Sequence, residues 1–283
     1  MRIGPQGELT ANHHGAPHLL RAHLYRYEFR MKSFEAEHYL LRAELLWDQV
    51  KDRSSFPFTL PVVSRLSEVE FHPKVTFLVG ENGSGKSTLI EAIAVAWGFN
   101  AEGGSKNFNF KTHHAHSDLH RCMRLVKSVR RAKDGFFLRA ESYFNVATEI
   151  EKLDQEPGSP RIIDAFGGVS LHSQSHGESF FALLENRFHG NGLYILDEPE
   201  AALSPSRQLS MLTRMHDLIA EKSQFIIATH SPILMAYPDA WIYQIGPKGL
   251  DRVAYEDTEH YQVTRDFLNR PERMLDVLLE RDR

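Results

Sequence analysis

A glycine-rich stretch near residue 80 carries the residue types that hold a phosphate group. Residues 80–87 read Gly-Glu-Asn-Gly-Ser-Gly-Lys-Ser and match the pattern G-x-x-x-x-G-K-[ST] at every specified position. Glycines let the backbone curl so that its N–H groups point at phosphate oxygens, and the N-terminus of a following helix adds its positive end. The candidate phosphate-binding residues are therefore Glu81, Asn82, Gly83, Ser84, Gly85, Lys86, Ser87 and Thr88.

The residues on either side of this loop supply the context that the pattern needs. Residues 75–79 form a short apolar run typical of a buried strand, and residues 86–97 repeat apolar side chains at the spacing of a core-facing helix that ends at Gly98. A strand, a glycine loop and a helix in this order predict a P-loop. Lys86 is then expected to contact the β- and γ-phosphates of ATP and to assist catalysis, and Ser87 to ligate Mg²⁺.

Two carboxylates follow a second apolar run. Residues 193–196 (Leu-Tyr-Ile-Leu) run directly into Asp197 and Glu198. Such a run is more often a strand entering a solvated loop, but downstream of a P-loop it predicts a site. Asp197 is expected to help hold Mg²⁺, and Glu198 to polarise the water that attacks the γ-phosphate.

Alternating strands and helices must position these groups. Residues 224–228 predict a further buried strand, and Ser204-Pro205 and Ser231-Pro232 each combine an N-cap serine with a proline at the first helical position. This alternation predicts an α/β fold with a mostly parallel sheet flanked by helices. The inward face of the helix that begins at Pro205 is expected to consist of Leu209, Leu212, Met215, Leu218 and Ile219.

The remaining segments suggest how the chain is divided. Residues 1–33 are poorly patterned, and residues 34–283 are expected to form a single domain in which 100–190 contribute a small antiparallel and helical subdomain. Residues 117–131 have the spacing of an amphipathic helix, and residues 136–144 alternate like a strand. Helices are expected on both sides of Pro271, with core contacts from Phe267, Met274, Val277 and Leu278.

The downstream motifs resemble those of a known family. Residues 197–205 (Asp-Glu-Pro-Glu-Ala-Ala-Leu-Ser-Pro) and 226–231 (Ile-Ile-Ala-Thr-His-Ser) are similar to the Walker B, D-loop and switch-histidine series of ABC-type ATPases. Within these they resemble the SMC/RecF-like group, and especially its small stand-alone bacterial ATPases. The resemblance covers roughly residues 56–283 and implies an ABC ATPase-like P-loop fold. It also implies that His230 contacts the γ-phosphate and helps to order the attacking water.

The resemblance further implies an ATP-dependent homodimer with nucleotides held between the subunits. Its signature sequence would be residues 173–178 (Ser-Gln-Ser-His-Gly-Glu), where Ser175 and Gly177 contact the γ-phosphate bound by the partner copy. The N–H groups and dipole at the start of a helix suit an anion supplied in this way. The alternative is a polar helix cap with no partner.

Two departures from the family bear on activity. No glutamine occurs between Ser87 and Asp154, where the family carries its Q-loop, and Asn107 or Asn109 would have to substitute. The signature also lacks the usual Leu-Ser-Gly-Gly order. The sequence therefore predicts a slow ATPase, with a nucleotide-gated switch or recruitment module in DNA repair or defence as the alternative. The same departures disfavour the ATPase subunit of a membrane transporter.

Composition limits the remaining possibilities. The 33 basic and 37 acidic residues give 33 − 37 = −4, and no apolar run approaches the length of a membrane helix. A single cysteine, Cys122, excludes an intrachain disulfide. Together with the lack of a long apolar run, this predicts a cytoplasmic protein without membrane attachment. DNA or an effector protein is a further candidate partner, because residues 120–140 hold a basic strip, although a solvated face is the commoner reading. The histidines at 113, 114, 116 and 120 indicate a polar loop rather than a metal site.

Overall fold

A six-stranded sheet forms the centre of the protein. The computed structural model describes residues 36–106, 117–140, 143–155, 161–173, 175–246 and 248–280. The strand order is β5-β6-β7-β3-β8-β9, and every neighbouring pair is parallel except β8 with β9. The prediction of a mostly parallel sheet is confirmed. The strands are β3 (Val75–Val79), β5 (Asp134–Arg139), β6 (Gly192–Asp197), β7 (Gln224–Ala228), β8 (Trp241–Gly246) and β9 (Gly249–Val253).

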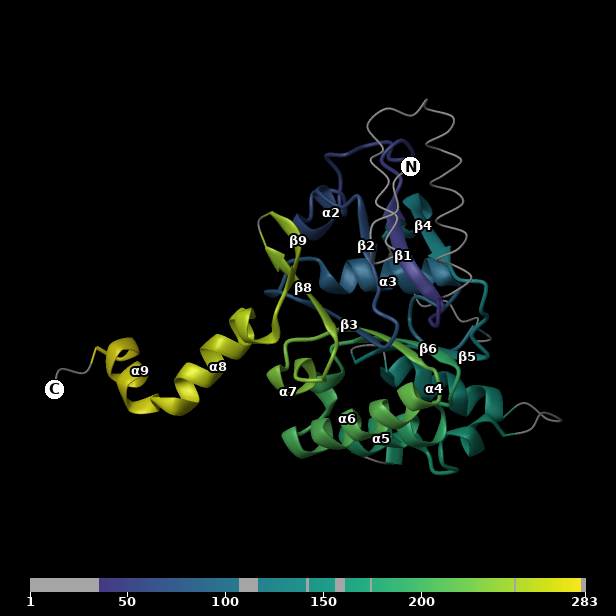
Figure 1. Ribbon diagram of the computed structural model, residues 1–283. Coiled ribbons are helices and arrows are strands. Elements are labelled where there is room, and N and C mark those ends of the chain that lie inside the picture. Colours follow the sequence, from purple (N-terminus) through teal and green to yellow (C-terminus); the bar gives the residue numbers. More distant parts are fainter. Residues whose placement is uncertain are drawn as a thin grey trace, which may run out of the picture.

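Helices cover both faces of this sheet (Figure 1). One face packs against α3 and a small antiparallel sheet, and the opposite face packs against α4, α5, α6 and α7. Because both faces are covered, every residue of β3, β6 and β7 is buried. The helices are α2 (Pro61–Ser64), α3 (Lys86–Trp97), α4 (Tyr143–Asp154), α5 (His176–Asn186), α6 (Pro205–Ala220) and α7 (Pro232–Met235), with 3-10 turns η1 (Asp118–Cys122), η2 (Ile162–Phe166), η3 (Leu171–Ser173), η4 (Pro199–Ala202) and η5 (Tyr255–Asp257).

The small sheet corrects one prediction. Residues 117–131 do not form a helix: η1 is followed by the strand β4 (Met123–Lys127), which pairs with β1 (Leu40–Leu45), and β1 pairs in turn with β2 (Glu68–Glu70). The buried Leu119 and Met123 are four residues apart and so imitate a helical spacing. Residues 123–127 form a strand because they pair with β1, about 80 residues earlier in the chain. Arg124 of β4 donates to the Glu44 carboxylate of β1 at 2.6 Å.

The helix that begins at Pro205 is confirmed, but its inward face differs in part from the predicted one. The Ser204 hydroxyl accepts from the backbone N–H of Arg207, and the face toward the core comprises Gln208, Met211, Met215 and Leu218. Leu209 is 59 % exposed, which makes that part of the prediction wrong. The polar Gln208 concealed the pattern because it donates to the backbone of Leu203 and accepts from Ser231 inside the core.

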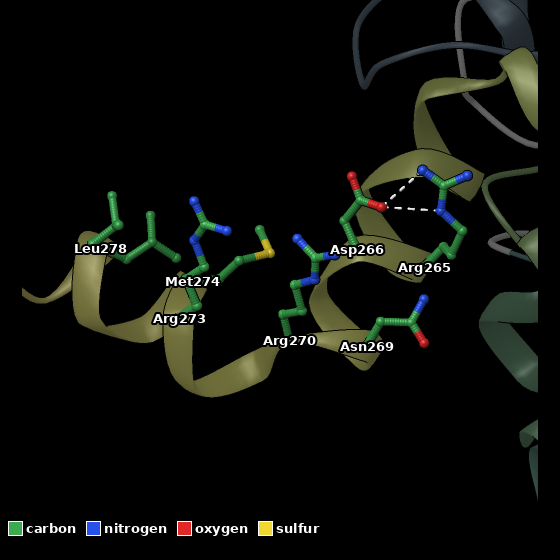
Figure 2. Close-up of a pocket in the computed structure, with 8 residues that line it drawn as sticks. Arg265, Asp266, Asn269, Arg270, Arg273, Met274 and Leu278 are labelled. Carbon is green, nitrogen blue, oxygen red and sulfur yellow. Dashed lines mark hydrogen bonds and ion pairs between the residues drawn. The ribbon is translucent and has the colours of Figure 1, made fainter.

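The C-terminal helices extend away from the body of the protein (Figure 1). Helices α8 (Glu259–Asn269) and α9 (Pro271–Leu278) lie on the two sides of Pro271, as predicted. Core contacts were also expected here and are wrong, since Val277 and Leu278 are 74 % and 69 % exposed and Phe267 is exposed as well. A hollow of about 810 Å³ lies along these helices and is lined by Arg265, Asp266, Asn269, Arg270, Arg273, Met274, Val277 and Leu278. Figure 2 shows how the side chains along it are arranged.

Substitutions in the exposed helix α9 and in the buried core are therefore expected to have very different effects on the free energy of unfolding. Replacing Val277 by Lys should change the free energy of unfolding by no more than about 0.5 kcal/mol, because the side chain is already in solvent. Replacing the fully buried Met215 by Ala should cost about 2–5 kcal/mol. Urea denaturation followed by circular dichroism measures both. A large loss for Val277→Lys would place the α9 face against other parts of the protein.

Several predictions fall outside the described residues. The arm 1–33, Asn107, Asn109 and the histidines at 113, 114 and 116 belong to this group. The division into a single domain over 34–283 stays a prediction. Within the described ranges, none of the helices has the length and apolar character needed to span a bilayer.

Candidate functional site

The loop between β3 and α3 has the backbone that its glycines predict. Gly85 is the N-cap of α3 with φ 96°, in the left-handed region that favours glycine. A Cβ at this position would lie 2.7 Å from Cγ1 of Val62 in α2, so the neighbouring helix also excludes a larger residue. The hydroxyl oxygen of Ser84 is buried and has no hydrogen-bond partner in the described part of the chain. A buried polar atom of this kind fits a loop built to meet a polar ligand.

Lys86 is held inside this loop. Its ammonium group donates to the backbone carbonyls of Gly80 at 2.8 Å and Glu81 at 3.0 Å, and the residue is 3 % exposed. Burial lowers the pKa of Lys86, and the carboxylates of Glu198, Asp197 and Glu200 act in the opposite direction. The Lys86 ammonium is therefore held in place by the loop carbonyls, and the charged groups around it are carboxylates.

Ser87 and Asp197 meet at the end of β6. The Ser87 hydroxyl donates to Oδ1 of Asp197 at 3.0 Å, and Asp197 is 5 % exposed. Nε of Arg139, at the end of the neighbouring strand β5, lies 3.5 Å from Oδ2 of Asp197, and its guanidinium also contacts Glu91 at 2.7 Å. A hydroxyl and a carboxylate fit Mg²⁺, which takes few protein ligands and completes its shell with phosphates and water. Among the described residues, no group of three or more His, Cys, Asp or Glu side chains is arranged so that it could hold a metal ion by itself.

Glu198 and His230 form the far side of the site. Glu198 adopts the left-handed conformation with φ 51° directly after β6, and its Oε1 lies 3.3 Å from Nε2 of His230. His230 follows β7, and its Nδ1 is 2.9 Å from Nε2 of His260. Burial and the Lys86 charge lower the pKa of His230. The His230 ring thus lies beside the Glu198 carboxylate in surroundings that favour its neutral form.

Three residues of this region were missed by sequence reasoning. Glu200 accepts the backbone N–H of His230, and burial raises the pKa of its carboxyl group. Arg139 joins β5 to Asp197, and His260 contributes a second ring from α8. Glu200 lies within residues 197–205, the motif that resembles the Walker B and D-loop sequences, so its position in that motif could have identified it. No local pattern marks Arg139 or His260, because strand pairing and helix packing bring them to the site.

Ser175 and Gly177 lie at the N-terminus of α5. The Ser175 hydroxyl accepts the backbone N–H of Glu178 at 3.4 Å, and the Glu178 carboxylate accepts the backbone N–H of Ser175 at 3.0 Å, which makes a capping box. Both side chains are exposed. A Cβ on Gly177 would lie 3.0 Å from the carbonyl oxygen of Ala202, so the helix end packs closely on η4. The structure thus brings Lys86, Ser87, Asp197, Glu198 and His230 together and presents the start of α5 at the surface.

Two protein families match successive parts of the chain. Residues 56–165 match a family described as "AAA domain", and residues 167–236 match a family described as "AAA domain, putative AbiEii toxin, Type IV TA system". The first match contains the loop 80–87, and the second contains Asp197, Glu198 and His230. Both matches support a P-loop ATPase.

Individual relatives are more distant. "ABC transporter G family member STR2" of Medicago truncatula is 27 % identical over 172 residues, which are 56 % of this chain and 24 % of the transporter, so the chain spans about a quarter of that relative. The SMC head domain from Thermotoga maritima is 19 % identical with a TM-score of 0.38, covering 76 % of this chain and 98 % of that one. CbiO1 from Clostridium perfringens, described as part of the ABC transporter complex cbiONQ, is 17 % identical with a TM-score of 0.43, covering 86 % and 99 %.

Proposed function

Because the chain carries a P-loop ATPase domain, we propose that it binds Mg·ATP and hydrolyses it slowly to ADP and phosphate. One observation carries this proposal. Asp197 is the last residue of β6, and Lys86 and His230 follow the carboxyl ends of β3 and β7, so all three lie at one edge of three adjacent parallel strands. Ligands of open α/β sheets bind beyond this edge. This edge of the sheet therefore holds a cation that can bind phosphates (Lys86), oxygen ligands for Mg²⁺ (Ser87 and Asp197) and a carboxylate that can activate water (Glu198).

Each residue has a distinct part in the proposed reaction. The Lys86 ammonium, which donates to two loop carbonyls, would turn to the β- and γ-phosphate oxygens. Ser87 and Asp197 would hold Mg²⁺, which neutralises phosphate charge when bound. Glu198 would orient the attacking water and accept its proton, and His230 would donate a hydrogen bond to the γ-phosphate. Catalysis then comes from positioning and charge, with no covalent intermediate.

Calorimetric titration and phosphate release test this function on the full chain. Titration with Mg·ATP should show binding, and phosphate should appear slowly and only while Mg²⁺ is present, with EDTA as the comparison. The absence of nucleotide binding would contradict the proposal. Tight binding without phosphate release would instead select the nucleotide-gated switch, the second candidate, which is favoured by the absence of glutamine between Ser87 and Asp154.

The proposal includes a dimer in which Ser175 and Gly177 of one copy contact the γ-phosphate held by the other. The exposed N-terminus of α5 supports it, since the positive end of the helix dipole faces solvent, and an anion from outside would replace the capping contacts between Ser175 and Glu178. In this dimer one copy would supply the loop, Asp197 and Glu198, and the other copy would complete the site with Ser175 and Gly177.

The Glu198→Gln protein is expected to be a dimer in the presence of Mg·ATP and a monomer in its absence, because it should retain ATP without cleaving it. Light scattering after size-exclusion chromatography measures the mass. Adding Ser175→Arg should leave a monomer, because the larger side chain fills the position of the phosphate. Ser210→Arg, at an exposed serine of α6, is the matched control. Equal dimer formation by the Ser175→Arg protein would remove the signature residues from the contact.

DNA or an effector protein remains a proposed partner. The basic residues of 120–140 do not form one helical face. Two of them are already engaged, since Arg124 pairs with Glu44 and the Lys127 ammonium lies 4.3 Å from the ring centre of Trp97. Arg121, Arg130 and Arg131 remain exposed and support contact with phosphates. Repeating the sizing experiment with duplex DNA tests this partner. A cytoplasmic location also remains proposed, supported by the buried free thiol of Cys122.

A further inference from the structure

A histidine outside every sequence motif reaches the candidate site. His260 lies in the first turn of α8, and its Nε2 is 2.9 Å from Nδ1 of His230. The other nitrogen of the His230 ring, Nε2, lies 3.3 Å from Oε1 of Glu198. The three side chains therefore form a continuous row from α8 to the carboxylate that is proposed to activate water.

The surroundings of both imidazole rings favour the neutral form. Burial lowers the pKa of His230 and of His260, and the Lys86 charge lowers both further. Glu198 acts in the opposite direction on His230, as do Glu259 and Glu81 on His260. A neutral imidazole carries one N–H and one lone pair, so the tautomer of each ring decides which atoms donate.

Two pairs of tautomers can form the hydrogen bond between the His230 and His260 rings, and the groups around the rings favour one of them. If Nδ1 of His230 donated to His260, the Nε2 lone pair of His230 would face the Glu198 carboxylate at 3.3 Å. Nδ1 of His260 would then carry an N–H, although this atom is buried and lacks a hydrogen-bond partner among the described residues. If His260 donates instead, the Nε2–H of His230 faces the Glu198 carboxylate at 3.3 Å without a hydrogen bond in the described structure, and His260 buries only a lone pair at Nδ1. The second arrangement avoids the repulsion and places the one unpaired donor beside Glu198, on the side where the γ-phosphate is proposed to bind.

We propose that His260 donates its Nε2–H to Nδ1 of His230 and thereby fixes His230 as an Nε2–H donor toward Glu198 and toward the γ-phosphate of bound ATP. His260 is then a positioning residue that acts through His230. Its effect on turnover rests on the proposed ATPase function, whereas the tautomer belongs to the protein alone.

The tautomer is read directly by NMR of the full chain labelled with ¹⁵N-histidine and free of nucleotide. Protonated and unprotonated ring nitrogens resonate in separate regions, and the signals of His230 are those lost in the His230→Gln protein. We expect an unprotonated Nδ1 and a protonated Nε2 for His230. A protonated Nδ1, or two averaged nitrogens, would overturn the proposal whether or not the protein hydrolyses ATP.

Two substitutions at His260 separate positioning from packing. His260→Leu removes the donor and should lower kcat by about 10-fold, the effect of losing one hydrogen bond, while the Kd for ATP changes by less than about 3-fold. His260→Gln places a carboxamide N–H near the position of the ring Nε2 and should restore most of the rate. Val263→Ala, at an exposed position of α8, is the matched control and should match the unmodified protein.

The outcomes distinguish the alternatives. Equal losses in His260→Leu and His260→Gln, with unchanged melting temperatures, would show that the donor is irrelevant and overturn the proposal. Normal turnover by His260→Leu would do the same. If the unmodified protein binds ATP without hydrolysing it, the ATPase function fails, and the NMR result alone decides whether His260 fixes the tautomer.

Discussion

Replacing Glu198 by Gln is expected to lower the rate of ATP hydrolysis by about 10²-fold or more, which makes it one of the two largest effects predicted for this chain. The carboxylate lies directly after β6, in a left-handed conformation that turns the chain toward η4, and its Oε1 faces His230 at 3.3 Å. Gln has nearly the same shape but cannot accept a proton from water. The binding of ATP should persist, because Lys86, Ser87 and Asp197 are unchanged.

Single-turnover hydrolysis of γ-labelled ATP measures the rate, and calorimetry measures the Kd. Glu256→Gln serves as the control, since Glu256 is an exposed carboxylate on η5. Normal hydrolysis by the Glu198→Gln protein would exclude this carboxylate from the mechanism and leave the activation of water to another group. A loss of ATP binding would instead assign Glu198 to the phosphate site itself.

The local parts of the fold could be predicted because their causes are local. Residues 75–79 and 224–228 are apolar except for the buried Thr76 and Gln224, because both faces of the sheet are covered and a covered strand needs no polar side. Gly85 and Gly98 both adopt left-handed conformations at the two ends of α3, where the sequence predicted a helix start and stop. In these segments the chemical type of each residue determines its conformation.

The errors arise where distant segments decide the outcome. Residues 123–127 become a strand because β1 offers a partner, and no spacing within 117–131 records that partner. The amphipathic pattern of α9 was correctly read as helical, but periodicity does not say whether the apolar face meets its own chain. The exposure of Val277 shows that in the described structure it does not.

The candidate site divides in the same way. Lys86, Ser87, Asp197 and Glu198 belong to short motifs whose spacing reports their chemistry, and the structure places them within one region. His260 follows His230 by 30 residues and meets it only because α8 begins beside the end of β7. Residues that position a catalytic group through tertiary packing leave no mark that a motif search can detect.

Replacing Lys86 by Ala is expected to weaken ATP binding by at least about 10²-fold. Hydrogen bonds to a charged group contribute about 1.5–3 kcal/mol each, so two bonds to phosphate oxygens correspond to a factor of about 10² or more. The charged groups that act on Lys86 are the carboxylates of Glu198, Asp197 and Glu200, so removal of the ammonium leaves the loop beside three acidic groups. Without the ammonium, these carboxylates repel the triphosphate, and the loss exceeds that of the two bonds alone.

Calorimetric titration with Mg·ATP measures this loss, and Lys74→Ala is the matched control because Lys74 is an exposed lysine beside Asp239. Lys86→Arg separates charge from shape. The lysine stem is 3 % exposed and ends between two carbonyls, where the wider guanidinium has no room without displacing the loop. We therefore expect Lys86→Arg to bind ATP nearly as weakly as Lys86→Ala, whereas binding at full strength would show that the loop tolerates any cation and that its glycine-built shape contributes less than the charge.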